Sequence, residues 1–448
     1  MSACGDTQES FDLCPGRSSP ELGSALFHLE AFCQTCQDLS SGYMEADTLP
    51  FKQPGPLLSV EKHPELQPYR SLDASRLKIV GERNWNMEAY LDGPLWLPFQ
   101  EPSFLLHGLP VSMEDVPNFE VESSDECMKL AKLWDVRGLL CLMPDPIAPG
   151  LFSRVFNAFK DRDRDRQIGD RRLPNLSEHH VNGPSKQLPQ GPQLTSVRVP
   201  RFTHLLRGSV TDRRDFYHQA AVTLERAQSN MLPFAYPTEA FVGTQAYAGL
   251  LERSNQKPPR AREIAGDQLD CRSAPKQPKR HSLVPERVHP CFSSLFQGDH
   301  LGVEFALRSH SLLLENHGLL RSEHRILGGC PVPIGRCWDA LVIDDYFAFG
   351  IEPVSSPPEK SFAMHSLAVA RGVYQKEGLM GSDEKDVVAQ PVFKAAGAEV
   401  RSSEKNARSG VIPVGAPFSK RIALSVLSLR SAVLPGTSAR LRSEERRV

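Results

Sequence analysis

The sequence predicts an α+β domain built on an antiparallel sheet, and two stretches carry this expectation. Residues 340–350, ALVIDDYFAFG, place two aspartates between apolar runs. This is the pattern of a β-hairpin with a two-residue turn, here at Asp344 and Asp345. Residues 205–212 form a second short run, which ends at Asp212 and which we expect to lie alongside the hairpin. Helices that follow Tyr217 and Gln297 should cover one face of the sheet.

Four regions follow one another along the chain. We expect an irregular, acidic, Pro-rich region over 1–120, a lead-in helix and a short strand-bearing segment over 121–200, the sheet-bearing segment over 201–400 with a basic insertion at about 253–290, and a basic tail over 401–448. The lead-in helix is predicted because apolar residues recur at helical spacing, at Cys127, Leu130, Ala131 and Trp134, after a capping Ser123 or Ser124.

Composition is that of a folded, loop-rich chain. It has 448 residues, of which 40% are hydrophobic and 24% charged, with 37 prolines and 31 glycines. No apolar run approaches the about 18 residues of a membrane span, and the N-terminus has no pattern of a secretory signal. Ten scattered cysteines fit reduced thiols inside a cell, in either the cytoplasm or the nucleus. The sequence sets no oligomeric state.

Charge is distributed unevenly. The net charge is −13 over 1–150, +8 over 151–300, −4 over 301–400 and +7 over 401–448. Basic regions that flank a carboxylate-bearing segment suit a partner with a phosphate backbone, although they also fit ordinary solvated surfaces.

Carboxylates recur at two strand ends. The stretch LLRGSVTDRRDFYHQ, residues 205–219, holds Asp212 and Asp215, and the hairpin holds Asp344. If the two strands are neighbours, Asp212 and Asp344 can converge on divalent cations. Two hard cations about 3.5–4 Å apart, held by carboxylate oxygens, can clamp both oxygens of an in-line phosphoryl displacement. Taken alone, the hairpin aspartates also fit a plain surface turn.

Four blocks in order resemble the reverse transcriptases, the right-hand polymerases of retroelements, over roughly residues 150–400. DRQIGDRRLPN resembles the fingers block, with matching residues Arg166, Asp170, Arg172 and Asn175, and Lys160 as a second basic candidate upstream. TDRRDFYHQ resembles the first palm motif, with Asp212, Asp215, Phe216 and Tyr217.

The other two blocks lie further along the chain. Gln297 and Gly298, followed by a helix-like run, resemble the family's Gln-Gly motif, and the hairpin resembles its double-aspartate turn. A weaker fifth block covers 374–400, where Lys385 stands for the family's downstream lysine.

The resemblance implies a palm, an antiparallel sheet with helices on one face, together with fingers, a short or incomplete thumb and an irregular N-terminal region. It implies an RNA-directed DNA polymerase in which Asp212 and Asp344 hold two Mg²⁺ (or Mn²⁺) ions and Asp345 supports the turn. Its partners would be an RNA or DNA template with a primer, and dNTPs, with no membrane.

The resemblance also assigns the remaining site residues. Arg166, helped by Lys160, would grip the triphosphate, Lys385 would be a general acid for the leaving pyrophosphate, and Tyr217 would lie under the sugar. Asp215, Phe216, Gln297 and Gly298 would complete the nucleotide site. Plainer roles compete: Arg166 lies in an alternating charge run, Gln297 could cap a helix, and Phe216 rather than Tyr217 could face the site.

Departures from the family pattern keep a second function open. The chain has a basic insertion, and only 401–448 remain for a thumb. A decayed or domesticated element copy that binds RNA or DNA without polymerising is therefore the alternative, while an RNA-templated RNA polymerase is disfavoured by Tyr217. Cys33 and Cys36 have zinc-ligand spacing near Cys14 and His28, but the second ligand pair is missing and we expect no zinc site.

Overall fold

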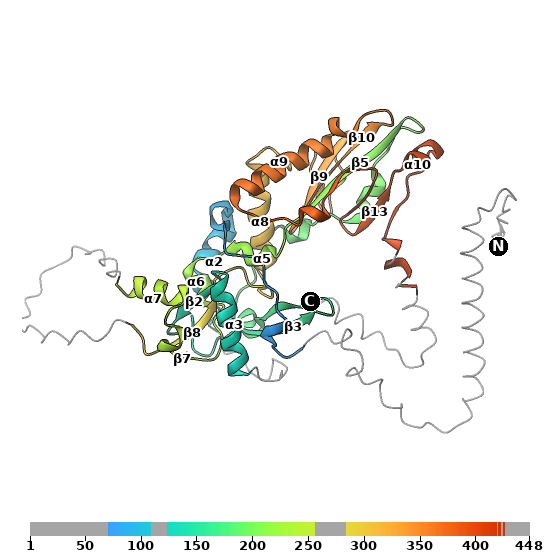
Figure 1. Cartoon of the computed structure of the whole chain (residues 1–448). Coiled ribbons are helices and arrows are strands. Elements are labelled where there is room, and N and C mark those ends of the chain that lie inside the picture. Colours follow the sequence, from blue (N-terminus) through green and yellow to red (C-terminus); the bar gives the residue numbers. More distant parts are fainter. Residues whose placement is uncertain (1–69, 109–122, 256–283, 419, 423, 426–448) are drawn as a thin grey trace, which may run out of the picture. The chain divides into compact units, whose positions relative to one another are not determined.

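A four-stranded antiparallel sheet carries the aspartates singled out in the sequence. The computed structural model describes residues 70–108, 123–255, 284–418, 420–422 and 424–425 (Figure 1). The strand order is β11-β5-β10-β9. These strands span Val387–Gln390 (β11), His204–Asp212 (β5), Asp345–Pro353 (β10) and Cys337–Val342 (β9).

The register of this sheet brings two aspartates side by side. In β10, Asp345 pairs with Asp212 of β5 on one side and with Val342 of β9 on the other. The hairpin turn is therefore Ile343–Asp344, one residue earlier than the Asp344–Asp345 turn predicted from the sequence. The φ angle is +56° at Ile343 and negative at Asp344. A positive φ at only the first of the two turn residues is the pattern of a type II′ turn. Turn preference alone would not select a β-branched residue at that position.

Helices cover one face of the sheet, as predicted. Helix α9 (Phe362–Glu377) packs on β10 and β5, and α8 (Gly302–Glu315), which follows the Gln-Gly pair, packs on β9 and α9 (Figure 1). Alternation along β10 sorts its side chains: Tyr346 and Ala348 belong to the core on the helix side, and Phe347 and Phe349 to the core on the other face.

One helix differs from the prediction. Helix α5 (Phe216–Gln219), which contains Tyr217, has only four residues, so α9 takes the covering role expected of a helix after Tyr217. The opposite face of the sheet packs on a three-stranded sheet of order β12-β13-β14, which spans Val392–Ala395, Ala398–Arg401 and Val414–Gly415.

The segment upstream of β5 forms a second set of small elements. Helix α3 (Ser124–Val136) begins after Ser123, which accepts hydrogen bonds from two backbone N–H groups, and buries the four apolar residues predicted at helical spacing. The antiparallel hairpin β3–β4 spans Arg154–Phe159 and Asp165–Asp170. Trp134 Nε1 donates to Gln167 Oε1 at 2.7 Å, which ties α3 to β4. The predicted lead-in helix is confirmed.

Residues 70–108 are more ordered than the expected irregular N-terminal region. They form helices and strands of only two to five residues. These elements bury Trp85, Met87 and Phe99 in the same core as α8. The expectation missed this because 3-10 turns of three or four residues leave no helical or alternating pattern to read.

The remaining elements connect these parts. They are β1 (Trp85–Asn86), α2 (Trp96–Gln100), β2 (Leu140–Met143), α4 (Arg172–Ser177), β6 (Ala220–Ala221), α6 (Leu224–Gln228), β7 (Tyr236–Pro237), α7 (Gln245–Asn255), β8 (Arg287–Phe292) and α10 (Glu404–Ser409). Helix α7 runs to Asn255 and β8 begins at Arg287, so both ends of the predicted insertion at 253–290 belong to regular elements.

Contacts place the described residues from 70 to 421 in one compact unit. The cysteine pair Cys33–Cys36, with Cys14 and His28, lies outside the described residues. Among the helices of the described part of the chain, none is long and apolar enough to cross a membrane.

Candidate active site

Three carboxylates meet where β5 ends and the hairpin turns. Ligand oxygens of Asp212, Asp344 and Asp345 all lie within 4.8 Å of one another. Asp212 is the last residue of β5, Asp344 lies in the turn, and Asp345 begins β10. The convergence of Asp212 and Asp344 that the strand-end argument predicts is thus present, and Asp345 joins them as a third possible ligand.

The pKa of each of these three carboxylates is raised in the folded chain. Burial is the main cause for all three. Burial and the neighbouring Asp212 raise the pKa of Asp344 to about 6, while burial, Asp344 and Asp212 raise that of Asp345 to about 7. In the described part of the chain, no lysine or arginine forms an ion pair with any of the three. Clustered hard oxygen donors that no described cation pairs with directly fit Mg²⁺ or Mn²⁺.

A single cleft gathers most residues predicted for the site. It has a volume of about 530 Å³. Its lining includes nine of those residues: Lys160, Arg166, Asp212, Asp215, Phe216, Tyr217, Gln297, Asp344 and Lys385. Asp345 and Gly298 are the two that do not line it, although each directly adjoins a residue that does.

Cations border this cleft without protein partners. Lys160 and Arg166 come from the β3–β4 hairpin, and Lys385 ends the short turn Asp383–Lys385 before β11. Lys78 joins them from the segment Leu77–Val80. Within the described residues, none of these four side chains forms an ion pair, and all four are exposed. Cations held near an acidic cluster but free of it are suited to a polyanionic ligand.

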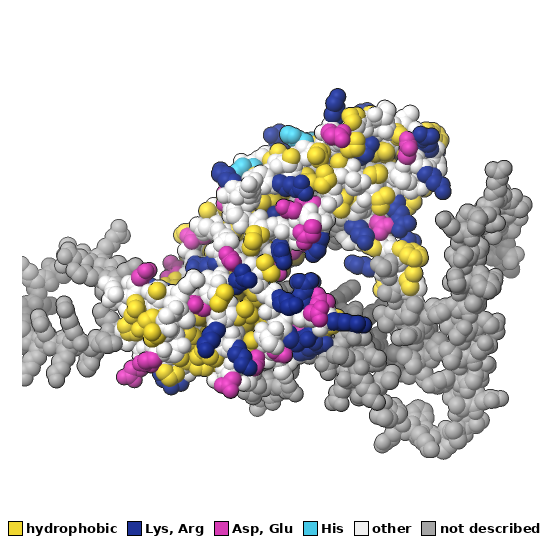
Figure 2. Space-filling view, viewed as in Figure 1, with side chains coloured by type: hydrophobic (Ala, Val, Ile, Leu, Met, Phe, Trp, Pro, Cys, Tyr) yellow, Lys and Arg dark blue, Asp and Glu magenta, His cyan; other side chains and the backbone are white. Residues whose placement is uncertain are grey.

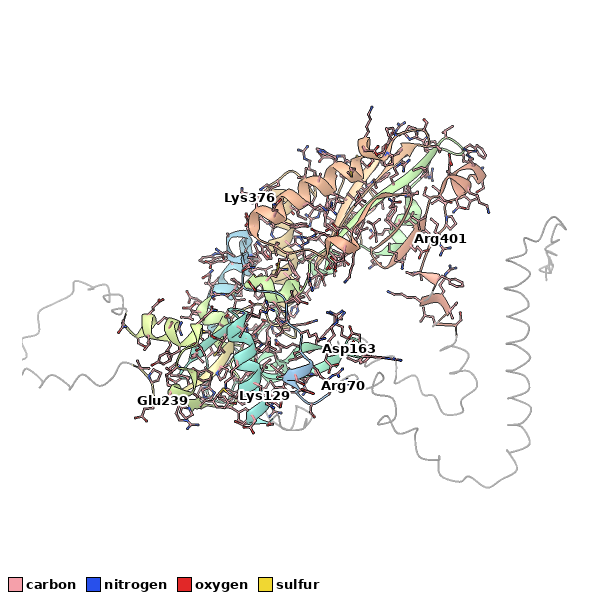
Figure 3. The ribbon with its side chains drawn as sticks, viewed as in Figure 1. Arg70, Lys129, Asp163, Glu239, Lys376 and Arg401 are labelled. Atoms are coloured by element: carbon pink, nitrogen blue, oxygen red, sulfur yellow. The ribbon has the colours of Figure 1, made fainter. Side chains whose placement is uncertain are left out.

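The hairpin that supplies two of these cations is itself fixed by charge. Arg70 and Arg76 both pair with the buried Asp165 at the start of β4, at 3.3 and 2.9 Å (Arg70 is labelled in Figure 3). Lys and Arg side chains gather over β3 in the space-filling view, with Asp and Glu side chains among them (Figure 2). The surface over this hairpin is therefore basic but not uniformly so.

Asp215 joins a separate segment to the cleft. Its Oδ2 accepts hydrogen bonds from the backbone N–H groups of Val80 and Gly81, at 3.0 and 3.3 Å. Although burial opposes ionisation, His218, these two hydrogen bonds and Lys160 hold the pKa of Asp215 below its usual value. Asp215 is thus an ionised anchor that keeps the Lys78 segment against the cleft. Sequence reasoning missed Lys78 because no motif surrounds it.

The Gln-Gly pair packs against the β3–β4 hairpin. Gly298 has a φ of 122°, and a Cβ there would lie 1.9 Å from the carbonyl oxygen of Gly169 in β4. The N–H of Gly169 donates to the Gln297 carbonyl at 2.6 Å, and Asn175 Nδ2 donates to the Gly298 carbonyl at 2.9 Å. Gly298 therefore allows the two backbones to approach, and Gln297 lines the cleft beside them.

The two aromatic residues after Asp215 take different places. Phe216 is only 2% exposed, and its ring packs 5.5 Å from Trp85 and 5.2 Å from His310, centroid to centroid. Tyr217 is partly exposed and lines the cleft with Asp344. Both residues thus border the cleft, but most of the Phe216 ring is packed in the core, and Tyr217 is the more exposed of the two.

A second acidic cluster is internally balanced. Ligand atoms of Glu178, Asp299 and His300 also lie within 4.8 Å of one another. Arg171 pairs with Glu178 at 2.7 Å and with Asp299 at 2.9 Å, and Arg226 also pairs with Asp299. Two guanidinium groups thus balance two carboxylates, and burial lowers the pKa of His300 to about 4. We assign this cluster to structure.

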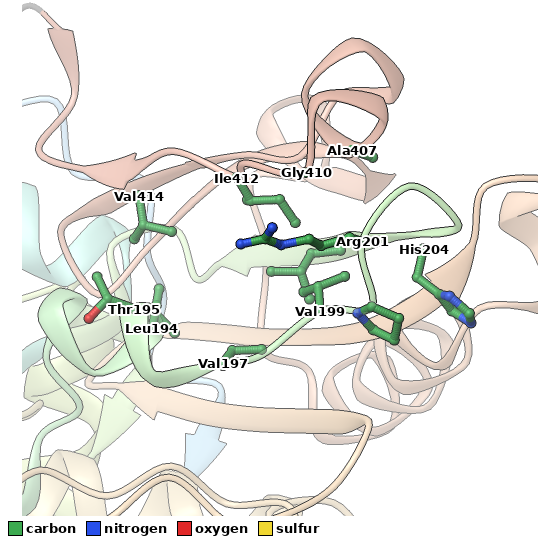
Figure 4. Close-up of a pocket in the computed structure, with 12 residues that line it drawn as sticks. Leu194, Thr195, Val197, Val199, Arg201, His204, Ala407, Gly410, Ile412 and Val414 are labelled. Carbon is green, nitrogen blue, oxygen red and sulfur yellow. The ribbon is translucent and has the colours of Figure 1, made fainter.

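Another hollow lies away from the carboxylates. It has a volume of about 310 Å³ and is lined mainly by aliphatic side chains between 194–206 and 407–414, with Arg201 and His204 among them (Figure 4). None of the predicted site residues borders it, so the cleft with Asp212 and Asp344 is the candidate active site.

Comparison with known proteins gives a limited structural likeness. No protein-family model and no curated protein sequence matches the chain. Among solved structures, a foamy viral protease–reverse transcriptase in complex with double-stranded DNA matches with a TM-score of 0.40 and 10% identity, over 84% of this chain and 51% of that one. The chain thus spans about half the length of that protein. At this level of likeness, function has to be argued from the site.

Proposed function

We propose that this chain is an RNA-directed DNA polymerase, which transfers a nucleotide from a dNTP to a primer 3′-hydroxyl. The observation that carries the proposal is one cleft in which the converging carboxylates of Asp212 and Asp344, with Asp345 beside them, face four cations that form no ion pair among the described residues. Metal-assisted transfer to a nucleic acid needs both: oxygen ligands for divalent ions, and positive groups for the triphosphate.

The carboxylates form the centre of the reaction. Asp212 and Asp344 would hold two Mg²⁺ or Mn²⁺ ions, with Asp345 as a further ligand, and these ions would lower the pKa of the primer hydroxyl and neutralise charge on the triphosphate. The 3′-oxygen attacks the α-phosphorus, a new P–O bond forms, and the bond to the β-phosphate oxygen breaks. Pyrophosphate leaves, and the hydroxyl proton goes to solvent.

The cations and the Gln-Gly loop position the nucleotide. Arg166, Lys160 and Lys78 would bind phosphate oxygens by charge-assisted hydrogen bonds. Lys385 contributes a positive charge near Asp212, and its ammonium can protonate the departing pyrophosphate. Gln297 would contact the template or the incoming base, because it lines the cleft next to the backbone that Gly298 fixes against β4.

Tyr217 would select the sugar. A ring face packed against C2′ leaves no room for a 2′-hydroxyl, and a packed site does not relax cheaply. Tyr217 lines the cleft, and most of the neighbouring Phe216 side chain is packed in the core. This position of Tyr217 supports a preference for deoxynucleotides.

Primer extension tests the proposal. The purified chain is given primed RNA and primed DNA templates with either dNTPs or NTPs, in Mg²⁺ and in Mn²⁺. We expect extension with dNTPs on RNA. Binding of primed template without extension would instead favour the element copy that has lost polymerisation, and extension with NTPs alone would favour an RNA polymerase.

A further inference from the structure

The turn that carries Asp344 has a backbone that its own residues do not favour. Ile343 has a φ of 56°, in the left-handed region that β-branched residues rarely adopt. Such conformations persist where the surroundings hold them, and they concentrate at functional sites. The question is which contacts hold this turn.

His310 of α8 contacts the turn directly. Its Nδ1 lies 2.8 Å from the carbonyl oxygen of Ile343, and its Nε2 lies 2.8 Å from the hydroxyl of Tyr374 in α9. Because a carbonyl only accepts, Nδ1 must carry the proton and donate it. Burial lowers the pKa of His310 to about 3, so the ring is neutral and Nε2 accepts from the Tyr374 hydroxyl in the Nδ1–H tautomer.

Packing holds the His310 side chain in a single orientation. It is 0% exposed, and rings of Trp85, Phe216 and Tyr374 pack around it at centroid distances of 6.3, 5.2 and 5.4 Å. Water cannot replace either hydrogen bond without opening this core. The imidazole therefore links α9 to the turn through two hydrogen bonds in a fixed orientation.

The same contacts continue to the other catalytic strand. The guanidinium carbon of Arg213 lies 4.0 Å from the centroid of the Tyr374 ring. Arg213 donates to the Leu379 carbonyl at 3.2 Å and to the Thr211 hydroxyl. Arg213 directly follows Asp212, as Ile343 directly precedes Asp344. One continuous set of side chains thus joins the residues next to both aspartates.

We propose that His310 is a positioning residue, which together with Tyr374 and Arg213 sets the separation of Asp344 and Asp212 and so the affinity of the carboxylates for divalent cations. The link to catalysis rests on the proposed polymerase function, whereas the link to cation affinity does not. Residues that orient metal ligands typically matter by about 10-fold to 100-fold in metal affinity or activity.

The test compares three variants of the full chain with a matched control. H310L fills the space but cannot donate to Ile343, H310N keeps an N–H donor at the place of Nδ1, and Y374F removes only the hydroxyl. The control is H289L, which removes a similar contact, from His289 Nδ1 to the Leu232 carbonyl at 2.8 Å, in another part of the chain. Thermal unfolding identifies any variant that does not fold.

Mn²⁺ affinity, measured by electron paramagnetic resonance, is the first readout, because it needs no activity. We expect H310L to weaken Mn²⁺ binding by about 10-fold or more, Y374F by several-fold, and H310N by less than H310L. ¹⁵N NMR of the parent should show the Nδ1–H tautomer at His310. The second readout is primer extension, where kcat should fall without a change in KM for primed template.

The outcomes separate the two proposals. Weaker Mn²⁺ binding in H310L together with an inactive parent would support the positioning role and overturn the polymerase function. An active parent whose H310L variant matches H289L in Mn²⁺ affinity and kcat would overturn the positioning role alone. If H310L does not fold, Y374F decides: unchanged Mn²⁺ affinity overturns the inference. A parent that binds no Mn²⁺ overturns both.

Discussion

Replacement of Asp345 by Asn should stabilise the protein when no divalent cation is present. The oxygens of Asp345, Asp344 and Asp212 lie within 4.8 Å of one another. Two full charges at that separation repel by about 3.5 kcal/mol at an effective permittivity of about 20. Solvent screening and partial protonation reduce this, because the carboxylates are only partly buried. We expect D345N to raise the free energy of unfolding by about 1–2 kcal/mol at pH 8.

The sign of the pH dependence follows from the direction of the pKa shifts. Burial and carboxylate neighbours raise the pKa of Asp345 to about 7 and that of Asp344 to about 6 in the folded chain. The folded state therefore holds protons that the unfolded state has lost, and the free energy of unfolding falls as pH rises from about 4 through about 7. D345N should reduce this fall, and its stabilising effect should be smaller at pH 5 than at pH 8.

Urea unfolding at pH 5 and pH 8, with EDTA or with Mg²⁺, measures these effects. Asp163, an exposed carboxylate in the β3–β4 loop that Figure 3 labels, provides the matched control D163N. Mg²⁺ should stabilise the parent more than D345N. A D345N variant that is no more stable than the parent at pH 8 in EDTA would refute the argument that the three carboxylates repel one another in the folded chain.

Three further changes should act on separate parts of the site. G298A should destabilise the chain by about 3 kcal/mol or more, measured by urea unfolding, because a Cβ would overlap the Gly169 carbonyl and an L-residue cannot easily hold a φ of 122°; equal stability would contradict the close approach. Y217V should admit ribonucleotides while dNTP incorporation stays within about 10-fold, scored by single-nucleotide extension; unchanged exclusion of NTPs would show that Tyr217 is not the gate. R166Q should raise KM for dNTPs by about 10-fold with little effect on template affinity; an unchanged KM would leave Arg166 a solvated surface charge.

The sequence predicted the β9–β10 hairpin and its neighbour β5, because strands that are buried in a core consist of runs of apolar residues. The apolar runs on both sides of the aspartates in 340–350 predicted the hairpin, and the register of the folded sheet places Asp345 opposite Asp212. The position of the turn was wrong by one residue because the aspartates are good turn residues, while the contact that holds Ile343 comes from His310, distant in sequence.

The parts that sequence could not supply depend on long-range contacts. Lys78 reaches the cleft only because Asp215 binds the backbone at Val80 and Gly81. Phe216 and Tyr217 are adjacent, and only the packing around Trp85 decides which ring enters the core. No local pattern encodes either outcome.

The most direct test of the central claim is single-turnover extension by the parent and by D344N, with binding of the same primed RNA template measured alongside. Asp344 belongs to the carboxylate cluster and no described cation pairs with it, so its loss should affect the reaction rather than the template. The account predicts extension by the parent, and in D344N a fall of about 100-fold or more with template affinity within about 3-fold. Extension by D344N at the parental rate would contradict it.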